Sequence, residues 1–382
     1  MSQDRRRSSQ EDDFESLSQA DPSLEDLRQI LFGRQVARLE GELDDLERRL
    51  GEVGFIKPVG QRYVQWEGQQ VDEDSLLIAE VCHIDCHLKD MSPIAIGRYF
   101  TREYIDSGRA HDLEEQVLGS FERVAQGKEF VIIEGTGHAG VGSVLDMSNA
   151  RVAQLLQSKV LIVTVGGIGR PIDEILLNAA LFRLHDVEIV GVVLNKVLPE
   201  KLDMVEHYAR KALSKKGIDL FGVVPYQPLL AGPSLRQVLE DIDGELLNGE
   251  ERLDLTVTRT VVGAMSPHRA LQYLARDVLL ITPGDREDLI LTALSSYVAG
   301  VEDGTDVSGI VLTGGVEPHR NILRLIRRTP VPVILVGEDT YATATRIRDL
   351  VVKIRPDDTT KIALARRLIN NYVDIEGLLG RV

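Results

Sequence analysis

The chain of 382 residues has few cysteines and no long apolar run, features on which small secreted proteins and membrane proteins depend. Its only cysteines are Cys82 and Cys86, too few for the disulfide framework of a small secreted protein. No stretch approaches the ~20 apolar residues of a membrane span, and a polar, acidic segment stands where a signal peptide would have its apolar core. We therefore expect a cytoplasmic protein with no membrane partner.

Positive charge is also scarce. Lys and Arg number 44 against 60 Asp and Glu, which gives a formal net charge of -16. Such a surplus of negative charge repels a polyanion unless a local basic patch overrides it. We expect no nucleic-acid partner.

The first 50 residues divide into two segments. Residues 1–22 are charged and serine-rich, so we predict a disordered tail. Residues 23–50 are predicted to form an amphipathic helix, because Ser23 and Asp26 can form a capping box. Apolar residues then recur at helical spacing at Val36, Leu39, Leu43, Leu46 and Leu50. The helix either lies on its own sheet or forms a short coiled-coil seam, from which we expect a homo-oligomer.

The rest of the chain has an α/β pattern. Apolar runs at 53–56, 130–133, 160–165, 189–194 and 220–224 alternate with helical segments, which indicates a parallel sheet in a first domain over 51–245. The acidic segment 241–254 suggests a boundary. Five further runs, TVVGAM, DVLLITPG, SGIVLTGG, VPVILVG and LVVKI, predict a second, five-stranded parallel unit over 255–375. The predicted fold class is α/β, with two tandem parallel-sheet domains preceded by the helix.

Glycine-rich and charged loops follow the predicted strands, where parallel sheets place their functional residues. The loop EGTGHAGVGS offers a carboxylate for Mg²⁺ and backbone N–H groups for an anion, or forms a tight turn without a ligand. Lys57 follows the first strand, where its cation either holds a phosphate or is solvated. Asn195 and Lys196 follow another strand, where the Asn195 amide either pairs with a base or stabilises its own loop. The candidate nucleotide or anion ligands are Lys57, Gly135, Thr136, Gly137, His138, Gly140, Asn195 and Lys196, with Glu134 as metal ligand.

Two further patterns, one in each domain, can be interpreted either as a ligand site or as ordinary structure. Cys82, His83, Cys86 and His87 form C-H-x-x-C-H, but their segment has the apolar spacing of a helix packed on a sheet, so a buried helix end is preferred to zinc. In the second domain, loops after strands offer candidate ligands, although a capping aspartate and a solvated arginine explain the first pair equally well. These candidates are Asp285, Arg286, Thr313, Gly314 and Gly315.

Several motifs together resemble a known combination of domains. FIKPVGQRY, the DED at 72–74, IIEGTGHAGVGSVLDMSNARVAQLL, GGIGRPIDEILLN and GVVLNKVLPEK resemble the dethiobiotin-synthetase-like P-loop domain found at the amino-terminal end of long phosphate acetyltransferases. PGDREDLILTAL, GIVLTGG and the EDTY at 338–341 resemble the DRTGG domain that follows it there. The resemblance implies that Lys57 lies near substrate and phosphates, that Glu134 faces magnesium and that Asn195 reads the base.

The chain departs from this family at one motif. A P-loop domain begins with a strand, GxxxxGK[ST] and a helix, but here LEDLRQILFGRQ stands where the strand and loop belong. The one Gly-Lys pair, Gly127-Lys128, precedes a strand and is followed by Glu129. The first domain is thus P-loop-NTPase-like without a recognisable P-loop, and we expect Mg²⁺ and ATP or ADP to bind weakly or not at all.

We therefore expect a regulatory or sensing protein linked to acetyl-phosphate metabolism, with a small-molecule effector. The absent lysine and the absent acetyltransferase domain both argue against an enzyme. The first alternative is a Mg-ATP-dependent enzyme of the dethiobiotin synthetase or cobyrinate amidase class that acts on a carboxylate or amine. The second is a purely structural partner.

Overall fold

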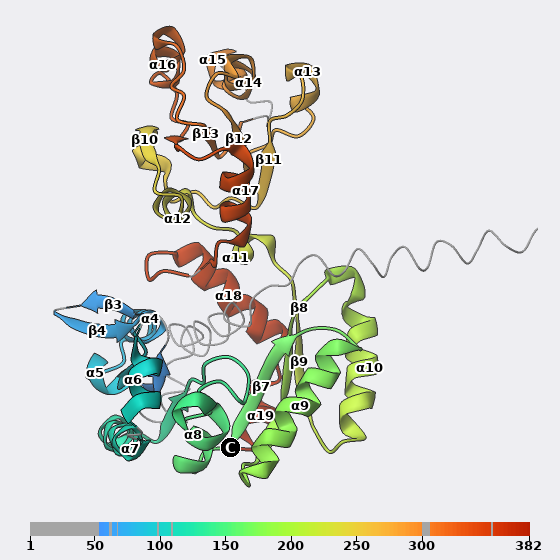
Figure 1. Ribbon diagram of the computed structural model, residues 1–382. Helices are drawn as coiled ribbons and strands as arrows, with labels where there is room; N and C mark the ends of the chain where they lie inside the picture. The colour runs from blue at the N-terminus through green and yellow to red at the C-terminus, as the bar shows by residue number, and fades with distance from the viewer. Residues whose placement is uncertain are drawn as a thin grey trace, which may run out of the picture. The chain divides into compact units, whose positions relative to one another are not determined.

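The structure, a computed structural model, describes residues 53–60, 63–66, 68–97, 99–107, 110–299, 306–352 and 354–382. The predicted tail at 1–22 and the predicted helix at 23–50 lie outside these residues. The described chain forms two compact units, which we treat separately: one extends to Tyr226 and includes Arg355–Val382, and the other is Gln227–Ile354. Figure 1 shows the elements of both.

The first unit is built from parallel strands and the helices that connect them. Its strands are β1 (Val53–Ile56), β2 (Val59–Gly60), β3 (Tyr63–Trp66), β4 (Gln69–Asp72), β5 (Ile94–Ala95), β6 (Phe130–Ile133), β7 (Val160–Val165), β8 (Ile189–Val197) and β9 (Leu220–Pro225). Its helices are α4 (Glu73–Cys82), α5 (Leu88–Met91), α6 (Phe100–Ser107), α7 (Ala110–Ala125), α8 (Asn149–Leu155), α9 (Arg170–Leu184), α10 (Leu202–Ser214), α18 (Thr359–Tyr372) and α19 (Ile375–Leu379), with 3-10 turns η2 (Ser143–Leu145) and η3 (Pro199–Lys201).

All five apolar runs predicted as strands in this unit are strands. They form two parallel ladders, β1–β6 and β7–β8–β9, and a short parallel pair β2–β5 and an antiparallel hairpin β3–β4 lie beside them. Strand β9 is buried along its whole length, as an apolar run in a parallel sheet requires. The end of α18 approaches β9 so closely that a Cβ at Gly222 would meet the Tyr372 carbonyl oxygen at 2.4 Å.

The second unit contains a mixed sheet of four parallel strands and one antiparallel strand. Its strands are β10 (Glu245–Asn248), β11 (Arg259–Val262), β12 (Val278–Pro283), β13 (Gly309–Thr313) and β14 (Val333–Leu335). Its helices are α11 (Pro228–Ala231), α12 (Leu235–Asp241), α13 (Pro267–Ala270), α14 (Glu287–Ala293), α15 (Ser295–Ala299), α16 (Arg320–Ile326) and α17 (Thr340–Asp349), with the 3-10 turn η4 (Glu250–Arg252). The strand order is β10-β14-β13-β12-β11.

The fifth strand of this sheet differs from the prediction. The described residues of LVVKI are not a strand; instead β10 pairs antiparallel with β14. Strand β10 lies within the acidic segment that we interpreted as a boundary. Leu253 of that segment is 2% exposed in the same apolar core as α12. The burial of these apolar side chains holds the segment in the second unit despite its charge, so the unit begins near Gln227 and ends at Ile354.

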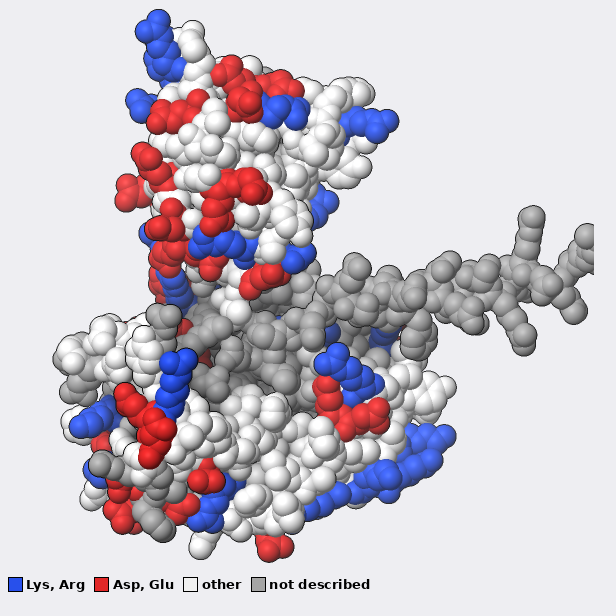
Figure 2. Space-filling view, viewed as in Figure 1, with Lys and Arg blue, Asp and Glu red and all other residues white. Residues whose placement is uncertain are grey.

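The surface carries charges of both signs. Figure 2 shows clusters of Asp and Glu over the second unit and a strip of Lys and Arg over the region of α9 and α10. In that region Arg183 donates a hydrogen bond to the carbonyl of Lys216. Among the helices that the structure describes, none is long and apolar enough to cross a membrane.

Candidate functional site

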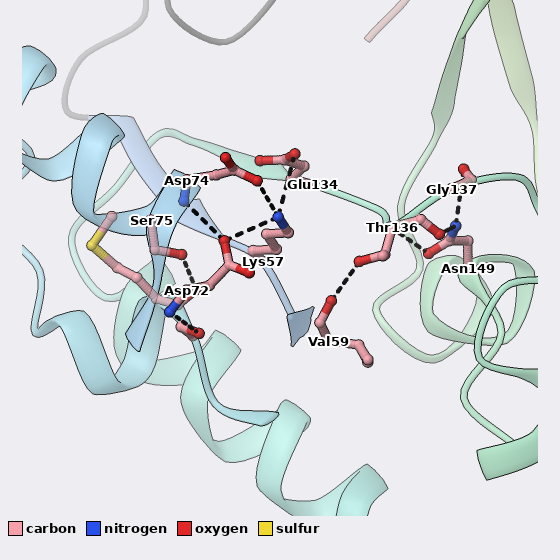
Figure 3. A network of polar contacts seen from close by, with 11 residues as sticks. Lys57, Val59, Asp72, Asp74, Ser75, Glu134, Thr136, Gly137 and Asn149 are labelled. Carbon is pink, nitrogen blue, oxygen red and sulfur yellow. Dashed lines mark hydrogen bonds and ion pairs between the residues drawn. The ribbon is translucent and has the colours of Figure 1, made fainter. Parts of the chain in front are cut away.

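The carboxyl end of β1 places a lysine among three carboxylates. Lys57 directly follows this strand, and its Nζ lies 2.9 Å from Asp72 Oδ1 and 3.9 Å from Glu134 Oε1 and contacts Asp74 (Figure 3). Asp72 ends β4 and caps α4 by accepting the N–H of Asp74 at 2.9 Å, while Glu134 follows β6, which pairs with β1. Three segments distant in sequence thus meet at one buried point.

Burial makes this network electrostatically tight. Lys57 is 5% exposed, Asp72 0% and Glu134 2%. Burial by itself would lower the pKa of Lys57, but the carboxylates of Glu134, Asp74 and Asp72 outweigh it and raise the pKa above its ordinary value of 10.5. The ammonium therefore remains charged at neutral pH and serves as the cation of the cluster.

The glycine loop after β6 is shaped by one asparagine that the sequence analysis did not single out. Asn149, the first residue of α8, accepts the Thr136 N–H at 3.0 Å and donates to the carbonyls of Thr136 and His138 at 2.7 and 2.9 Å. Thr136 Oγ1 in turn donates to the Val59 carbonyl at 2.5 Å (Figure 3). An asparagine following a serine cap was the only sequence signal for this role. The contacts hold the loop in one conformation.

The loop forms one end of a large cavity in the first unit, of about 1290 Å³. Of the predicted ligands, Glu134, Gly135, Gly137, His138 and Gly140 line it. His138 is exposed, and its Nδ1 accepts the Gly140 N–H at 3.2 Å. The structure thus gathers the glycine-loop candidates around one space, while Lys57 and Thr136 are buried beside it.

Asn195 and Lys196 lie at the carboxyl end of β8, outside the lining of this cavity. The Asn195 side chain is 2% exposed; its Oδ1 accepts the Lys196 N–H at 2.7 Å, whereas its Nδ2 makes no hydrogen bond to the described residues. A buried amide N–H without a partner is costly. This amide is therefore a candidate ligand group at the carboxyl end of β8.

The carboxylates are neutralised by Lys57 in this arrangement. The ammonium of Lys57 lies between them, and no group of three or more His, Cys, Asp or Glu in the described part of the chain could hold a metal ion. The same holds for the C-H-x-x-C-H residues, of which Cys82 ends α4 and His83 is its left-handed cap. Burial raises the pKa of the Cys82 thiol, which opposes metal binding.

The candidate residues of the second unit lie at the ends of β12 and β13. Arg286 is not a solvated arginine: it bonds Asp288 at 2.9 and 3.0 Å and the Met265 carbonyl at 3.0 Å, and Asp285 is not the cap of α14. The Asp288 carboxylate raises the pKa of Arg286. Thr313 Oγ1 shares a hydrogen bond of 2.7 Å with Thr340 Oγ1.

Gly314 and Gly315 form the turn after β13. Both have positive φ, 82° and 65°, and their N–H groups donate to the carbonyls of Glu338 and Val336 at 2.7 and 2.9 Å. The two glycines are therefore explained by the turn that they make. Their N–H groups are occupied within the protein.

Comparisons with known proteins agree with these two units. A family model described as an AAA domain matches residues 45–234, and one described as a DRTGG domain matches residues 237–350. The phosphate acetyltransferase of Nitratidesulfovibrio vulgaris is 28% identical over 352 residues, which are 90% of this chain and 49% of the relative. The phosphate acetyltransferase of Deinococcus radiodurans is 29% identical over 330 residues, which are 83% of this chain and 45% of the relative. The chain spans about half the length of these curated relatives.

A solved structure shows a weaker likeness. It contains the CBS and DRTGG domains of the regulatory region of Clostridium perfringens pyrophosphatase with the activator diadenosine tetraphosphate; it is 19% identical, covers 47% of this chain and 88% of its own, and has a TM-score of 0.28. A score this low does not establish a common fold over that length. On the family matches, the chain carries a dethiobiotin-synthetase-like P-loop (AAA) domain followed by a DRTGG domain and matches the N-terminal region of phosphate acetyltransferases.

Proposed function

We propose that the protein is a regulatory, ligand-sensing member of this group, linked to acetyl-phosphate metabolism, in which the first unit binds the phosphate of a nucleotide at the loop 134–143 without turning it over. The DRTGG unit acts as the sensing or assembly module. A cytoplasmic location and a homo-oligomer belong to the same proposal. The observation that carries it is the position of Lys57, whose ammonium is committed to three carboxylates.

The ion pairs of Lys57 argue against catalysis of phosphoryl transfer, because that reaction depends on preorganised positive charge around the transferring group. The sequence offers no Gly-Lys-Ser/Thr motif, and Lys57 is buried with its charge already balanced by carboxylates. Moving it toward a phosphate would leave buried carboxylates without their cation, a cost of several kcal/mol. Within the loop the N–H groups of Thr136, Ala139 and Gly140 are already bonded inside the protein, so an anion would be held by the loop's other backbone N–H groups.

Two features support nucleotide binding in particular. The glycine loop borders the large cavity, so a ligand can approach its backbone. The Asn195 amide at the carboxyl end of β8 retains a donor that a base acceptor can satisfy. The same two features support the alternative of a Mg-ATP-dependent enzyme acting on a carboxylate or amine, in which Glu134 would face the metal.

Calorimetric titration with ADP and ATP, with Mg²⁺ and with EDTA, tests the proposal. We expect micromolar binding that does not require Mg²⁺, and no release of phosphate from ATP. His138→Glu places a negative charge on the exposed loop and should weaken binding at least about tenfold by repelling phosphate. The matched control is His268→Glu, which makes the same change at an exposed site of the second unit.

Two results would overturn the proposal. Binding that disappears in EDTA and in Glu134→Gln, accompanied by ATP turnover, would establish the enzyme instead. Failure of both nucleotides to bind the folded wild-type protein would leave the structural partner as the remaining interpretation.

A further inference from the structure

The sheet of the second unit has two edge strands, which differ in how they are protected. At one edge, β10 runs antiparallel to β14, and its register shifts between Leu246 and Asn248. The Asn248 side chain donates hydrogen bonds to the carbonyls of Thr329 and Val331 at 2.9 and 2.8 Å. Such an irregularity interrupts the regular row of backbone groups that a further strand needs for pairing. This edge is therefore protected.

The opposite edge strand, β11, is open. It pairs with β12, and no other strand in the described part of the chain pairs with it (Figure 1). Arg259 and Gly263 donate their N–H groups toward β12. Because alternate residues of a strand direct their backbone groups to opposite sides, those of Thr260 and Val262 point away from β12. The N–H groups of these two residues have no hydrogen-bond partner among the described residues.

Exposed apolar side chains accompany this open edge. Val262 is 40% exposed, and Leu271 and Tyr273, which follow α13, are 41% and 46% exposed. Arg259 donates a hydrogen bond to the Tyr273 carbonyl at 3.0 Å, so the edge strand and the segment after α13 lie side by side. Single exposed apolar residues are ordinary, but three of them beside an unpaired strand favour an interaction surface.

The charge of this region is opposite to that of the chain. Residues 255–276 contain three arginines, Arg259, Arg269 and Arg276, and no Asp or Glu, whereas the whole chain has a formal net charge of -16. Arg276 pairs with Asp306 at 3.5 Å. Arg259 and Arg269 are exposed and form no ion pair with the described residues.

The carboxylates that border this segment already have partners. Asp277 accepts a hydrogen bond from the Thr258 hydroxyl at 2.5 Å. Asp288 is paired with Arg286, whose guanidinium also bonds the Met265 carbonyl. Positive charge therefore remains uncompensated along the open edge.

We propose that β11 binds an extended acidic peptide of a partner protein, which adds a sixth strand to this sheet. The backbone groups of Thr260 and Val262 bond the peptide, Val262 and Tyr273 contact its apolar side chains, and Arg259 and Arg269 attract its carboxylates. A second copy of the chain fits this edge less well, because two-fold pairing of β11 with itself brings the same arginines together. The inference rests on the assembly role proposed for the second unit, and does not require nucleotide binding.

Fluorescence anisotropy with a labelled synthetic peptide, EVTVEVD, tests the proposal on the full chain without nucleotide. The matched peptide KVTVKVK has the same alternation of apolar and charged residues with the opposite charge. We expect EVTVEVD to bind with a Kd of about 10–100 micromolar, at least about tenfold more tightly than KVTVKVK, and more weakly as the salt concentration rises.

Two variants separate the charge from the backbone contacts. Arg259→Glu should weaken binding of EVTVEVD at least about tenfold. Thr260→Pro should do the same, because proline removes an N–H group that faces away from β12 and leaves the ladder between β11 and β12 intact. Arg328→Glu makes the same charge change at an exposed site just after α16 and should leave binding unchanged. Circular dichroism checks that each variant is folded, and Arg259→Gln provides a milder change.

Hydrogen exchange measured by mass spectrometry locates the bound peptide. EVTVEVD should slow exchange of the Thr260 and Val262 amides in fragments covering 258–264 and leave β10 unchanged. Failure of EVTVEVD to bind, equal affinity for the two synthetic peptides, or binding without protection of β11 would overturn the proposal. A wild-type chain that sediments as a dimer, with Thr260→Pro monomeric, would assign the edge to a second copy and overturn it as well. Because these measurements contain no nucleotide, failure of the proposed nucleotide site would not alter them.

Discussion

The two parallel sheets place charged residues at the same kind of edge but use them differently. At the carboxyl end of β1, Lys57 and its carboxylates are almost completely buried. At the carboxyl end of β12, Arg286 and Asp288 keep 32% and 46% of their side-chain surface exposed while they connect neighbouring loops. Topology therefore fixes where these charged residues gather, and burial decides how strongly their charges interact.

The difference has an energetic meaning. A charge taken out of water has to be compensated inside the protein, so removal of one partner from a buried cluster leaves the others uncompensated. An exposed pair is screened by water, and its loss is small. The first edge should therefore be sensitive to single substitutions and the second tolerant.

Lys57→Met should produce the largest effect. It leaves three carboxylates without their ammonium and should lower the free energy of unfolding of the first unit by about 3–5 kcal/mol. Urea unfolding followed by the fluorescence of Trp66, the only tryptophan and a residue of the first unit, measures this. An unchanged unfolding midpoint would show that the cluster is not electrostatically coupled.

The pH dependence of the same variant provides its control. Because the pKa of Lys57 is raised above 10.5, its stabilisation is fully present below pH 10.5 and is lost only as pH rises through the higher folded-state pKa. The stability difference between wild type and Lys57→Met should therefore be constant from pH 7 to pH 10. A difference that falls within this range would contradict the raised pKa.

Asn149→Ala should have an intermediate effect. It removes the partner of the Thr136 N–H and of two carbonyls, so the glycine loop loses its fixed conformation and stability falls by about 2 kcal/mol. Faster hydrogen exchange confined to 134–143 would accompany this loss. Asn371→Ala, at an exposed position of α18, is the matched control and should be neutral.

Arg286→Met should have the smallest effect, about 1 kcal/mol or less, because the arginine is partly exposed and its pair with Asp288 is screened. Arg348→Met sharpens the comparison. Arg348 forms an ion pair with Asp349 that is more exposed than the pair of Arg286 and Asp288, so we expect no measurable change in stability. Thermal unfolding of the second unit, followed by circular dichroism, measures both. A loss at Arg286 as large as that at Lys57 would remove the distinction between the two edges.

The sequence predicted the longer strands of both units well, except at LVVKI, whose described residues are not a strand. It failed at β10, since the segment ELLN is short and lies among acidic residues, and its pairing with β14 depends on a partner almost ninety residues away. It also missed Asn149, because a residue that organises a loop through backbone contacts leaves no distinctive pattern. Lys57 and Glu134 were identified as candidate site residues, but Asp72 and Asp74 were not, and neither was the ion-pair network that joins all four.

By itself, the sequence determined that this protein has two α/β units with glycine-rich and charged loops at strand ends, because hydrophobic periodicity and turn residues act over short distances. Only the tertiary structure decided that Lys57 neutralises Asp72, Asp74 and Glu134, and that β6 and β7 face a common cavity. Those facts depend on which distant segments become neighbours and on how deeply their charges are buried. The local sequence pattern specifies neither which distant segments become neighbours nor how deeply their charges are buried.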